Sequence, residues 1–241
     1  MPSSHTVSRN AHRHVIRVGR IARYDAGREL RTGAPEVVLG EGKRVDHLVH
    51  LLMGLASAGR GAFVSRLTPA QADALRAASA EKKLPVTVSP DGRLARLEGR
   101  FPTVGPSGRV AIVTAGTSDV PLADEARWIL EGCGAEVFEA HDVGVAGLHR
   151  LQTAVRRLER RRPHVYLAFA GREGALPTVL AGLVRAPVVG VPTSVGYGRG
   201  ARGEAALGAM LQSCAPIAVV NIDGAVPAAL FALQLLAGAS R

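Results

Sequence analysis

The sequence predicts an α/β protein: a three-layer parallel-sheet sandwich, Rossmann-like or flavodoxin-like, preceded by a smaller N-terminal α/β domain. Two observations lead to this prediction. Between residues 109 and 241, five short valine-rich apolar segments occur in succession, and a helical segment follows each of them. Strands with nearly continuous apolar residues are typical of parallel sheets, because helices cover both faces of such sheets. The 241 residues also suffice for one medium-sized and one small domain.

Composition excludes several classes of protein. The chain is 47% hydrophobic and 21% charged, as globular proteins are. It has two cysteines and no CxxC pattern, so neither a disulfide framework nor a zinc module organises the fold. The first twenty residues lack the apolar core of a signal peptide, and no apolar stretch reaches the roughly 18 residues of a membrane span. We therefore expect a cytoplasmic protein without a membrane partner.

The formal charge of +10 is unevenly distributed along the chain. Residues 1–108 hold 17 Lys and Arg against 9 Asp and Glu, whereas residues 109–241 hold 13 against 11. Aromatic residues make up only 4% of the chain, too few for stacking on single-stranded nucleic acid. No helix-turn-helix, zinc-finger or RNA-binding motif accompanies the charge. We expect no nucleic-acid partner, since a small anionic substrate explains a basic surface equally well.

The N-terminal part is predicted to begin with a basic, flexible tail over residues 1–19. His12 and His14 in this tail lack the third ligand of a metal site. From Arg20 to Leu39 the sequence is polar and broken by glycines.

A small α/β domain is predicted over residues 20–104. Apolar residues at helical spacing indicate a helix over Lys43–Ala58, and Thr68 caps a second helix that runs from Pro69 to about Glu81. Strands of this domain are expected at 62–67, 86–89 and 93–97. The Pro/Gly-rich segment 101–108 marks the domain boundary.

The C-terminal domain, residues 109–241, is predicted to hold the parallel sheet. Its strands are expected at 109–116, 135–141, 165–171, 186–192 and 217–222. Its helices are expected at 118–131, 147–160, 174–184, 203–214 and 225–237. Ligands of an open parallel sheet bind outside the carboxyl ends of the strands, where loops run into helix N-termini.

The loops at those strand ends are rich in glycine and in small hydroxyl or acidic residues. Glycine lets backbone amides approach a phosphate closely. Capping of the helices explains any single loop as well, but five converging loops favour an anion site. The loops are 114–119, 141–147, 170–174, 192–198 and 221–225.

Several side chains near these loops have both a chemical and a structural reading. Asp119 either grips a ribose hydroxyl or completes a helix N-cap, and Glu173 is either a general base or a charge that stabilises a helix start. His149 and Arg150 either face the cleft or lie on the surface. Cys133 is expected to be structural. Cys214 is expected at the end of helix 203–214. A lone intracellular cysteine is more often a small buried hydrophobic residue than a nucleophile, so its position alone does not make Cys214 catalytic.

Six motifs in order resemble the LarB family of nickel-pincer nucleotide cofactor biosynthesis. They are AIVTAGTSDVPLADEA, DVGVAGLHRL, AGREGALPTVLAGL, PVVGVPTSVGYG, LQSCA and VVNIDG, and they span most of 109–224. The segment YDAGRELRTGAPEVVLGEGK, 24–43, resembles the N-terminal signature of the same family. The C-terminal domain is also similar to the aminoimidazole ribonucleotide carboxylases of purine synthesis.

The resemblance implies a pyridinium-3,5-biscarboxylic acid mononucleotide synthase. Such an enzyme carboxylates the pyridinium ring of nicotinic acid adenine dinucleotide with carbon dioxide or bicarbonate and hydrolyses the phosphoanhydride, which releases AMP. The implied catalytic residues are Cys214, whose thiolate adds to the ring and makes it nucleophilic, and Glu173, which removes the ring proton.

The resemblance further implies a substrate-binding set drawn from all five loops. Its members are Gly116, Thr117, Ser118, Asp119, Asp142, His149, Arg150, Gly171, Thr193, Ser194, Gly196, Tyr197, Asn221 and Asp223. No tightly bound cofactor and no protein-bound metal is implied, although Mg²⁺ can assist the hydrolysis by bridging phosphate oxygens. The family and its purine relatives imply a homo-octamer.

Two positions depart from the family pattern. Arg172 stands where a neutral residue is expected, and Gly-Ala-Val-Pro follows Asp223 in place of an Asn-Gly turn. Two other functions therefore stay open. One is a purine-pathway carboxylase or mutase, whose electron-rich imidazole substrate needs no thiol. The other is a non-catalytic regulator that binds nucleotides or nucleic acid.

Overall fold

The structure is a computed structural model that describes residues 15–18, 22–101 and 108–239. It divides into two compact units, Met1–Pro102 and Thr103–Arg241. The tail residues His12 and His14 lie outside the described residues. Within the described part, no helix is both long enough and apolar enough to cross a lipid bilayer.

The described part of the first unit begins with two paired strands, so the prediction of a tail was wrong for residues 15–18, while residues 1–14 and 19 of the predicted tail lie outside the described residues. Strand β1 (Val15–Val18) pairs antiparallel with β2 (Ala22–Asp25). Val18 is 4% exposed and packs against Gly54, where an added Cβ would lie 2.7 Å from a Val18 methyl group. Arginines occupy the exposed face of this strand pair, which is why its composition resembles that of a tail.

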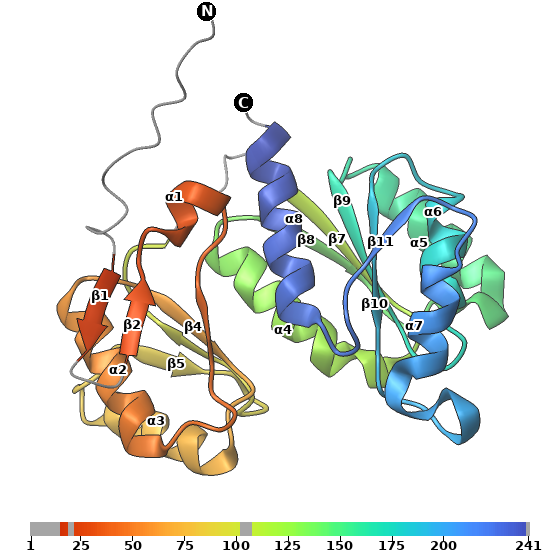
Figure 1. Ribbon diagram of the computed structural model, residues 1–241. Helices are drawn as coiled ribbons and strands as arrows, with labels where there is room; N and C mark the ends of the chain where they lie inside the picture. Colours follow the sequence, from red (N-terminus) through yellow and green to blue (C-terminus); the bar gives the residue numbers. More distant parts are fainter. Residues whose placement is uncertain (1–14, 19–21, 102–107, 240–241) are drawn as a thin grey trace, which may run out of the picture. The chain divides into compact units, whose positions relative to one another are not determined.

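A four-stranded sheet forms the rest of the first unit (Figure 1). Its strand order is β3-β4-β6-β5, with β3 parallel to β4 and the other pairs antiparallel. Thr68 accepts a hydrogen bond from the backbone of Gln71 and so caps a helix as predicted. The elements of this part are α1 (Arg28–Thr32), β3 (Val37–Leu39), α2 (Val45–Ser57), β4 (Ala62–Ser65), α3 (Pro69–Ala80), β5 (Val86–Val88) and β6 (Ala95–Leu97).

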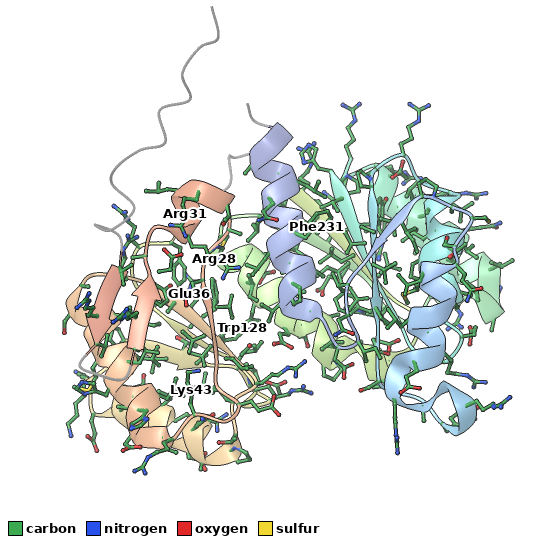
Figure 2. All side chains as sticks on the ribbon, in the orientation of Figure 1. Arg28, Arg31, Glu36, Lys43, Trp128 and Phe231 are labelled. Carbon is green, nitrogen blue, oxygen red and sulfur yellow. The ribbon has the colours of Figure 1, made fainter. Side chains whose placement is uncertain are left out.

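Charged residues of the segment 24–43 hold β2, α1 and β3 together. Arg31 donates to both carboxylate oxygens of Asp25 and thereby lowers the pKa of that carboxyl group. Glu36 accepts the Asp25 backbone N–H at 2.6 Å, and burial raises the pKa of Glu36 (Figure 2). These contacts give the segment a structural role within the first unit.

The second unit is the predicted three-layer α/β sandwich. Its five strands are all parallel, in the order β11-β10-β9-β7-β8. The central strand β9 is buried along its whole length. The strands are β7 (Arg109–Thr114), β8 (Glu136–Ala140), β9 (Val165–Ala170), β10 (Val188–Pro192) and β11 (Ile217–Val219).

Helices cover both faces of this sheet (Figure 1). Helices α4 and α8 pack together on one face, and α5, α6 and α7 lie on the other. Their bounds are α4 (Val120–Gly132), α5 (Leu148–Glu159), α6 (Ala175–Ala181), α7 (Glu204–Leu211) and α8 (Ala225–Ala239). The chain passes from β7 to β8 on one side and then to β9 on the other, so the strand order reverses between β7 and β9. A crevice opens at such a reversal, at the carboxyl ends of the strands.

Candidate active site

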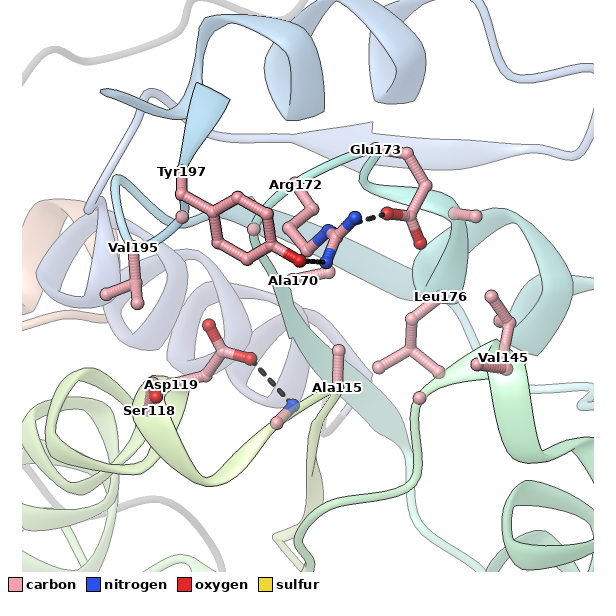
Figure 3. Close-up of a pocket in the computed structure, with 16 residues that line it drawn as sticks. Ala115, Ser118, Asp119, Val145, Ala170, Arg172, Glu173, Leu176, Val195 and Tyr197 are labelled. Carbon is pink, nitrogen blue, oxygen red and sulfur yellow. Dashed lines mark hydrogen bonds and ion pairs between the residues drawn. The ribbon is translucent and has the colours of Figure 1, made fainter. Parts of the chain in front are cut away.

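A pocket of about 300 Å³ lies at the carboxyl ends of β7, β8, β9 and β10, where the strand order reverses (Figure 3). The loops that leave these four strands supply its walls. The lining residues are Ala115, Gly116, Ser118, Asp119, Gly144, Val145, Ala146, Ala170, Gly171, Arg172, Glu173, Ala175, Leu176, Val195, Gly196 and Tyr197.

Asp119 is the buried acid of the pocket. It is 5% exposed and follows β7 in a short 3₁₀ turn, Thr117–Asp119. Its Oδ1 accepts the hydroxyl of the fully buried Thr193 at 2.7 Å, and its Oδ2 accepts the Gly116 N–H at 2.9 Å. Burial raises the pKa of Asp119, and these two hydrogen bonds act in the opposite direction. The carboxylate is thus held in one orientation beside the cavity, with lone pairs left for a ligand.

Arg172 and Glu173 follow β9 on the exposed side of the pocket. The Arg172 guanidinium donates to the Tyr197 hydroxyl and lies 4.6 Å from the centre of the Tyr197 ring. Its Nε lies 3.9 Å from Oε2 of Glu173 (Figure 3). The Glu173 side chain is 65% exposed, so its carboxylate is open to a ligand from solvent.

Two glycines let the loops approach each other closely. A Cβ on Gly171 would lie 2.2 Å from the carbonyl oxygen of Val195, and one on Gly144 would lie 2.8 Å from that of Ala115. Neither contact leaves room for a side chain. The glycines therefore bring adjacent strand ends close enough to enclose one pocket.

Seven of the predicted binding and catalytic residues line this pocket. They are Gly116, Ser118, Asp119, Gly171, Glu173, Gly196 and Tyr197. Thr193 lies behind them as the hydrogen-bond donor to Asp119. Thr117 lies in the same 3₁₀ turn as Ser118 but is not part of the wall.

The other predicted binding residues lie outside the pocket wall. Asp142 and Arg150 form an exposed ion pair at 2.6 Å, and the neighbouring His149 is exposed as well. Asp223 accepts the Ser194 N–H at 2.8 Å, and the Asn221 side chain accepts the N–H of the next residue. These contacts organise loops beside the pocket, which is a structural role for four of these six residues' side chains, those of Asp142, Arg150, Asn221 and Asp223.

Cys214 lies apart from the other predicted catalytic residue. Helix α7 ends at Leu211, so Cys214 stands in the segment that leads into the amino end of β11 and not at a helix end as predicted. It is exposed and does not line the pocket, which lies at the carboxyl ends of the strands. Within one copy of the chain, the structure does not bring Cys214 and Glu173 together. The buried Cys133 caps the end of α4, consistent with a structural residue.

Sequence reasoning missed the apolar wall of the pocket, which includes Val145, Leu176 and Val195. These side chains carry no chemistry of their own, and only their position next to the strand ends signals them. Arg172 also lines the pocket. Among the described residues, no three His, Cys, Asp or Glu side chains gather to hold a metal ion.

Comparisons with known proteins match both units. A family model described as AIR carboxylase matches residues 109–241, and one described as LarB/PurE-like N-terminal domain matches residues 16–98. An uncharacterised protein of Methanocaldococcus jannaschii is 39% identical over 211 residues, which are 86% of this chain and 81% of that protein. An N5-carboxyaminoimidazole ribonucleotide mutase of Pyrococcus abyssi is 36% identical over 135 residues, 53% of this chain and 73% of the mutase. A crystal structure of Treponema denticola PurE aligns at 23% identity and a TM-score of 0.42, over 54% of this chain and 85% of that one.

Proposed function

Because the chain belongs to the AIR carboxylase family, we propose that it is a carboxylase of a nucleotide substrate. More specifically, we propose that it carboxylates the pyridinium ring of nicotinic acid adenine dinucleotide and hydrolyses the phosphoanhydride. The products are pyridinium-3,5-biscarboxylic acid mononucleotide and AMP. One observation carries this choice of substrate: the LarB/PurE-like N-terminal domain precedes the carboxylase domain in a single chain. The match to the Pyrococcus mutase, by contrast, covers 53% of the chain.

The pocket supports binding of a nucleotide. Asp119 keeps acceptor sites free after its bonds to Thr193 and Gly116, and a ribose hydroxyl can donate to them. Glycines line the pocket beside the starts of helices, and helix starts suit phosphate oxygens. Apolar side chains such as Leu176 and Val195 supply a surface for a flat ring.

The proposed carboxylation uses a thiolate and a carboxylate in turn. A pyridinium ring is electron-poor and does not attack carbon dioxide. When the Cys214 thiolate adds to the carbon para to the ring nitrogen, the ring becomes a neutral dihydropyridine whose 5 position is nucleophilic. That carbon forms a bond to carbon dioxide, Glu173 removes its proton, and the ring regains aromaticity as the C–S bond breaks and the thiolate leaves.

We propose that a neighbouring copy of the chain supplies Cys214 to this pocket. The cysteine is exposed, and within its own copy it lies apart from the pocket wall. Helix α8 supports assembly of copies, since its 15 residues include no charged side chain and its Phe231 is 37% exposed (Figure 2). A helix that is apolar all round is typically covered on all sides. The expected homo-octamer would provide such neighbours.

The hydrolysis is the less defined half of the reaction. Water attacks the phosphoanhydride and AMP leaves, while the mononucleotide keeps its phosphate. We assign no step of the hydrolysis to a protein-bound magnesium ion, since the resemblance implies only that Mg²⁺ can assist by bridging phosphate oxygens. Any magnesium ion would enter with the diphosphate.

Mass spectrometry tests the proposed reaction directly. The protein is incubated with nicotinic acid adenine dinucleotide and bicarbonate, and the dicarboxylated mononucleotide and AMP are sought. We expect both products from the wild type. Glu173→Gln and Cys214→Ser are each expected to give no carboxylated product, and the control Cys133→Ala is expected to turn over as the wild type does. Full activity of Cys214→Ser would refute the thiolate mechanism.

Mixed assemblies test whether two copies share one site. Differently tagged Glu173→Gln and Cys214→Ser chains are co-expressed and purified through both tags. If one copy supplies the glutamate and another the cysteine, about one quarter of the sites in a random mixture hold both intact residues. Recovery of activity well above that of either variant alone is expected. No recovery would show that sites are not shared.

The identity to the Pyrococcus mutase favours one second candidate, an N5-carboxyaminoimidazole ribonucleotide mutase. Its imidazole substrate is already electron-rich, so carboxyl transfer needs no thiol. Turnover of that ribonucleotide by the wild type and equally by Cys214→Ser, without turnover of the dinucleotide, would establish this alternative.

A further inference from the structure

Arg172 is the one cationic side chain among the described residues that line the pocket. The same wall carries two acids, Asp119 and Glu173. An anionic substrate therefore meets more negative than positive side chains there, and the position of the single cation decides where a charged group of the substrate can bind.

The Arg172 guanidinium is held in place, but its contacts do not use all of its N–H donors. Its contacts are one hydrogen bond to the Tyr197 hydroxyl, the face of the Tyr197 ring at 4.6 Å, and Glu173 Oε2 at 3.9 Å from Nε. The last distance is too long for a hydrogen bond. A guanidinium has five N–H donors in a planar fork, so an edge of this fork remains for a ligand.

The backbone also fixes this arginine. Arg172 has a φ of +50°, a left-handed conformation that is uncommon for residues other than glycine. Gly200, from the loop between β10 and α7, packs against it, and a Cβ there would lie 2.9 Å from the Arg172 Cα. Backbone strain of this kind persists where the surroundings hold it, and it is concentrated at functional sites.

We propose that Arg172 determines the substrate specificity of this pocket by binding a carboxylate carried by the substrate ring. The inference rests on the proposed function. A carboxylate matches the guanidinium fork with two parallel hydrogen bonds. Arg172 and Glu173 are adjacent, and Glu173 is the group proposed to remove the ring proton. A ring carboxylate bound by Arg172 therefore lies on the same ring as the carbon that Glu173 deprotonates.

Two dinucleotides that differ in one group test this proposal. Nicotinic acid adenine dinucleotide carries a ring carboxylate, and nicotinamide adenine dinucleotide carries a neutral amide of nearly the same size. Their Kd values are measured by calorimetry on the full chain as wild type, Arg172→Met and Arg172→Lys. A charged hydrogen bond of ordinary strength corresponds to a preference of roughly 10- to 100-fold. We expect the wild type to prefer the acid by that factor, Arg172→Met to bind both alike, and Arg172→Lys to keep part of the preference.

The outcomes separate this proposal from the proposed function. An unchanged preference in Arg172→Met would overturn the role of Arg172 while the proposed reaction stands. An equal loss of affinity for both ligands would assign the arginine to a phosphate and also overturn the proposal. A wild type that binds neither dinucleotide would overturn both. Because Arg172 is exposed, its variants are expected to keep the wild-type unfolding midpoint in urea, which is measured in parallel.

Discussion

Replacement of Thr193 by valine removes the side-chain donor that orients the buried acid of the pocket. Thr193 is fully buried, and its hydroxyl lies 2.7 Å from Oδ1 of Asp119, which is 5% exposed. Valine keeps the branched shape but offers no proton. The Gly116 N–H then remains as the one hydrogen-bond donor that we find to this carboxylate among the described residues.

The expected magnitude follows from the charge of the acceptor. A hydrogen bond to a charged group is worth about 1.5 to 3 kcal/mol, and a buried carboxylate that loses one cannot turn to water. Burial already raises the pKa of Asp119, so the folded protein binds this proton more tightly than the unfolded chain does. The free energy of unfolding therefore falls as the pH rises from the ordinary aspartate value through the folded pKa. Thr193→Val raises this pKa further, so its cost is largest above that range and smaller where Asp119 is protonated.

Unfolding can be followed by the fluorescence of Trp128. This is the single tryptophan of the chain, and it lies on α4, the helix that follows Asp119 (Figure 2). Urea unfolding is followed at several pH values and at one protein concentration, because the proposed assembly would make stability depend on concentration. The control is Thr178→Val, which removes a neutral bond of 2.9 Å to Ser213 and should cost about 1 kcal/mol at every pH. A loss in Thr193→Val that equals the control and does not vary with pH would refute the reasoning.

Three further predictions follow from particular contacts. Gly171→Ala should destabilise the protein by about 1 to 3 kcal/mol and abolish ligand binding, measured by urea unfolding and calorimetry, because the new methyl group would meet the Val195 carbonyl. Gln71→Ala should destabilise the first unit by about 2 kcal/mol, measured by circular dichroism, because Gln71 takes part in the capping box of α3 and donates to the carbonyls of Gly40 and Lys43. Arg150→Met should lower the free energy of unfolding in urea by less than about 1 kcal/mol, because its pair with Asp142 is exposed and lies outside the pocket wall.

The sequence predicted the second unit better than the first for a physical reason. Strands such as β9 are buried on both faces, so they appear in the sequence as uninterrupted apolar segments. The strand pair of β1 and β2 buries one face only, with Ile16 and Val18 inward and arginines outward, and because this alternation is weak the residues of β1 were predicted to be part of a tail. Helix α1 has five residues, too few for a helical period to emerge.

The sequence predicted at which edge of the sheet the candidate site lies and two of its acidic residues. It did not predict which other residues line the site. The rule for parallel sheets placed ligands at the carboxyl ends of the strands, and Asp119 and Glu173 line the pocket found there. The rule says nothing about which loops close on each other, which depends on contacts such as that of Gly171 with Val195. Nor does the motif LQSCA, which contains Cys214, reveal that this side chain lies apart from the pocket of its own copy.

The net charge of the chain differs from the charge of the pocket wall. The surplus of eight positive charges over residues 1–108 belongs to the first unit and its preceding segment, whereas residues 109–241 carry a surplus of two. The pocket lies in the second unit, and its wall holds two acids and one arginine. The total charge of +10 therefore does not describe the pocket, whose wall carries more acidic than basic side chains. Arg172 is the one cationic side chain among the described residues of that wall, and that is why a change at Arg172 should alter which ligand binds.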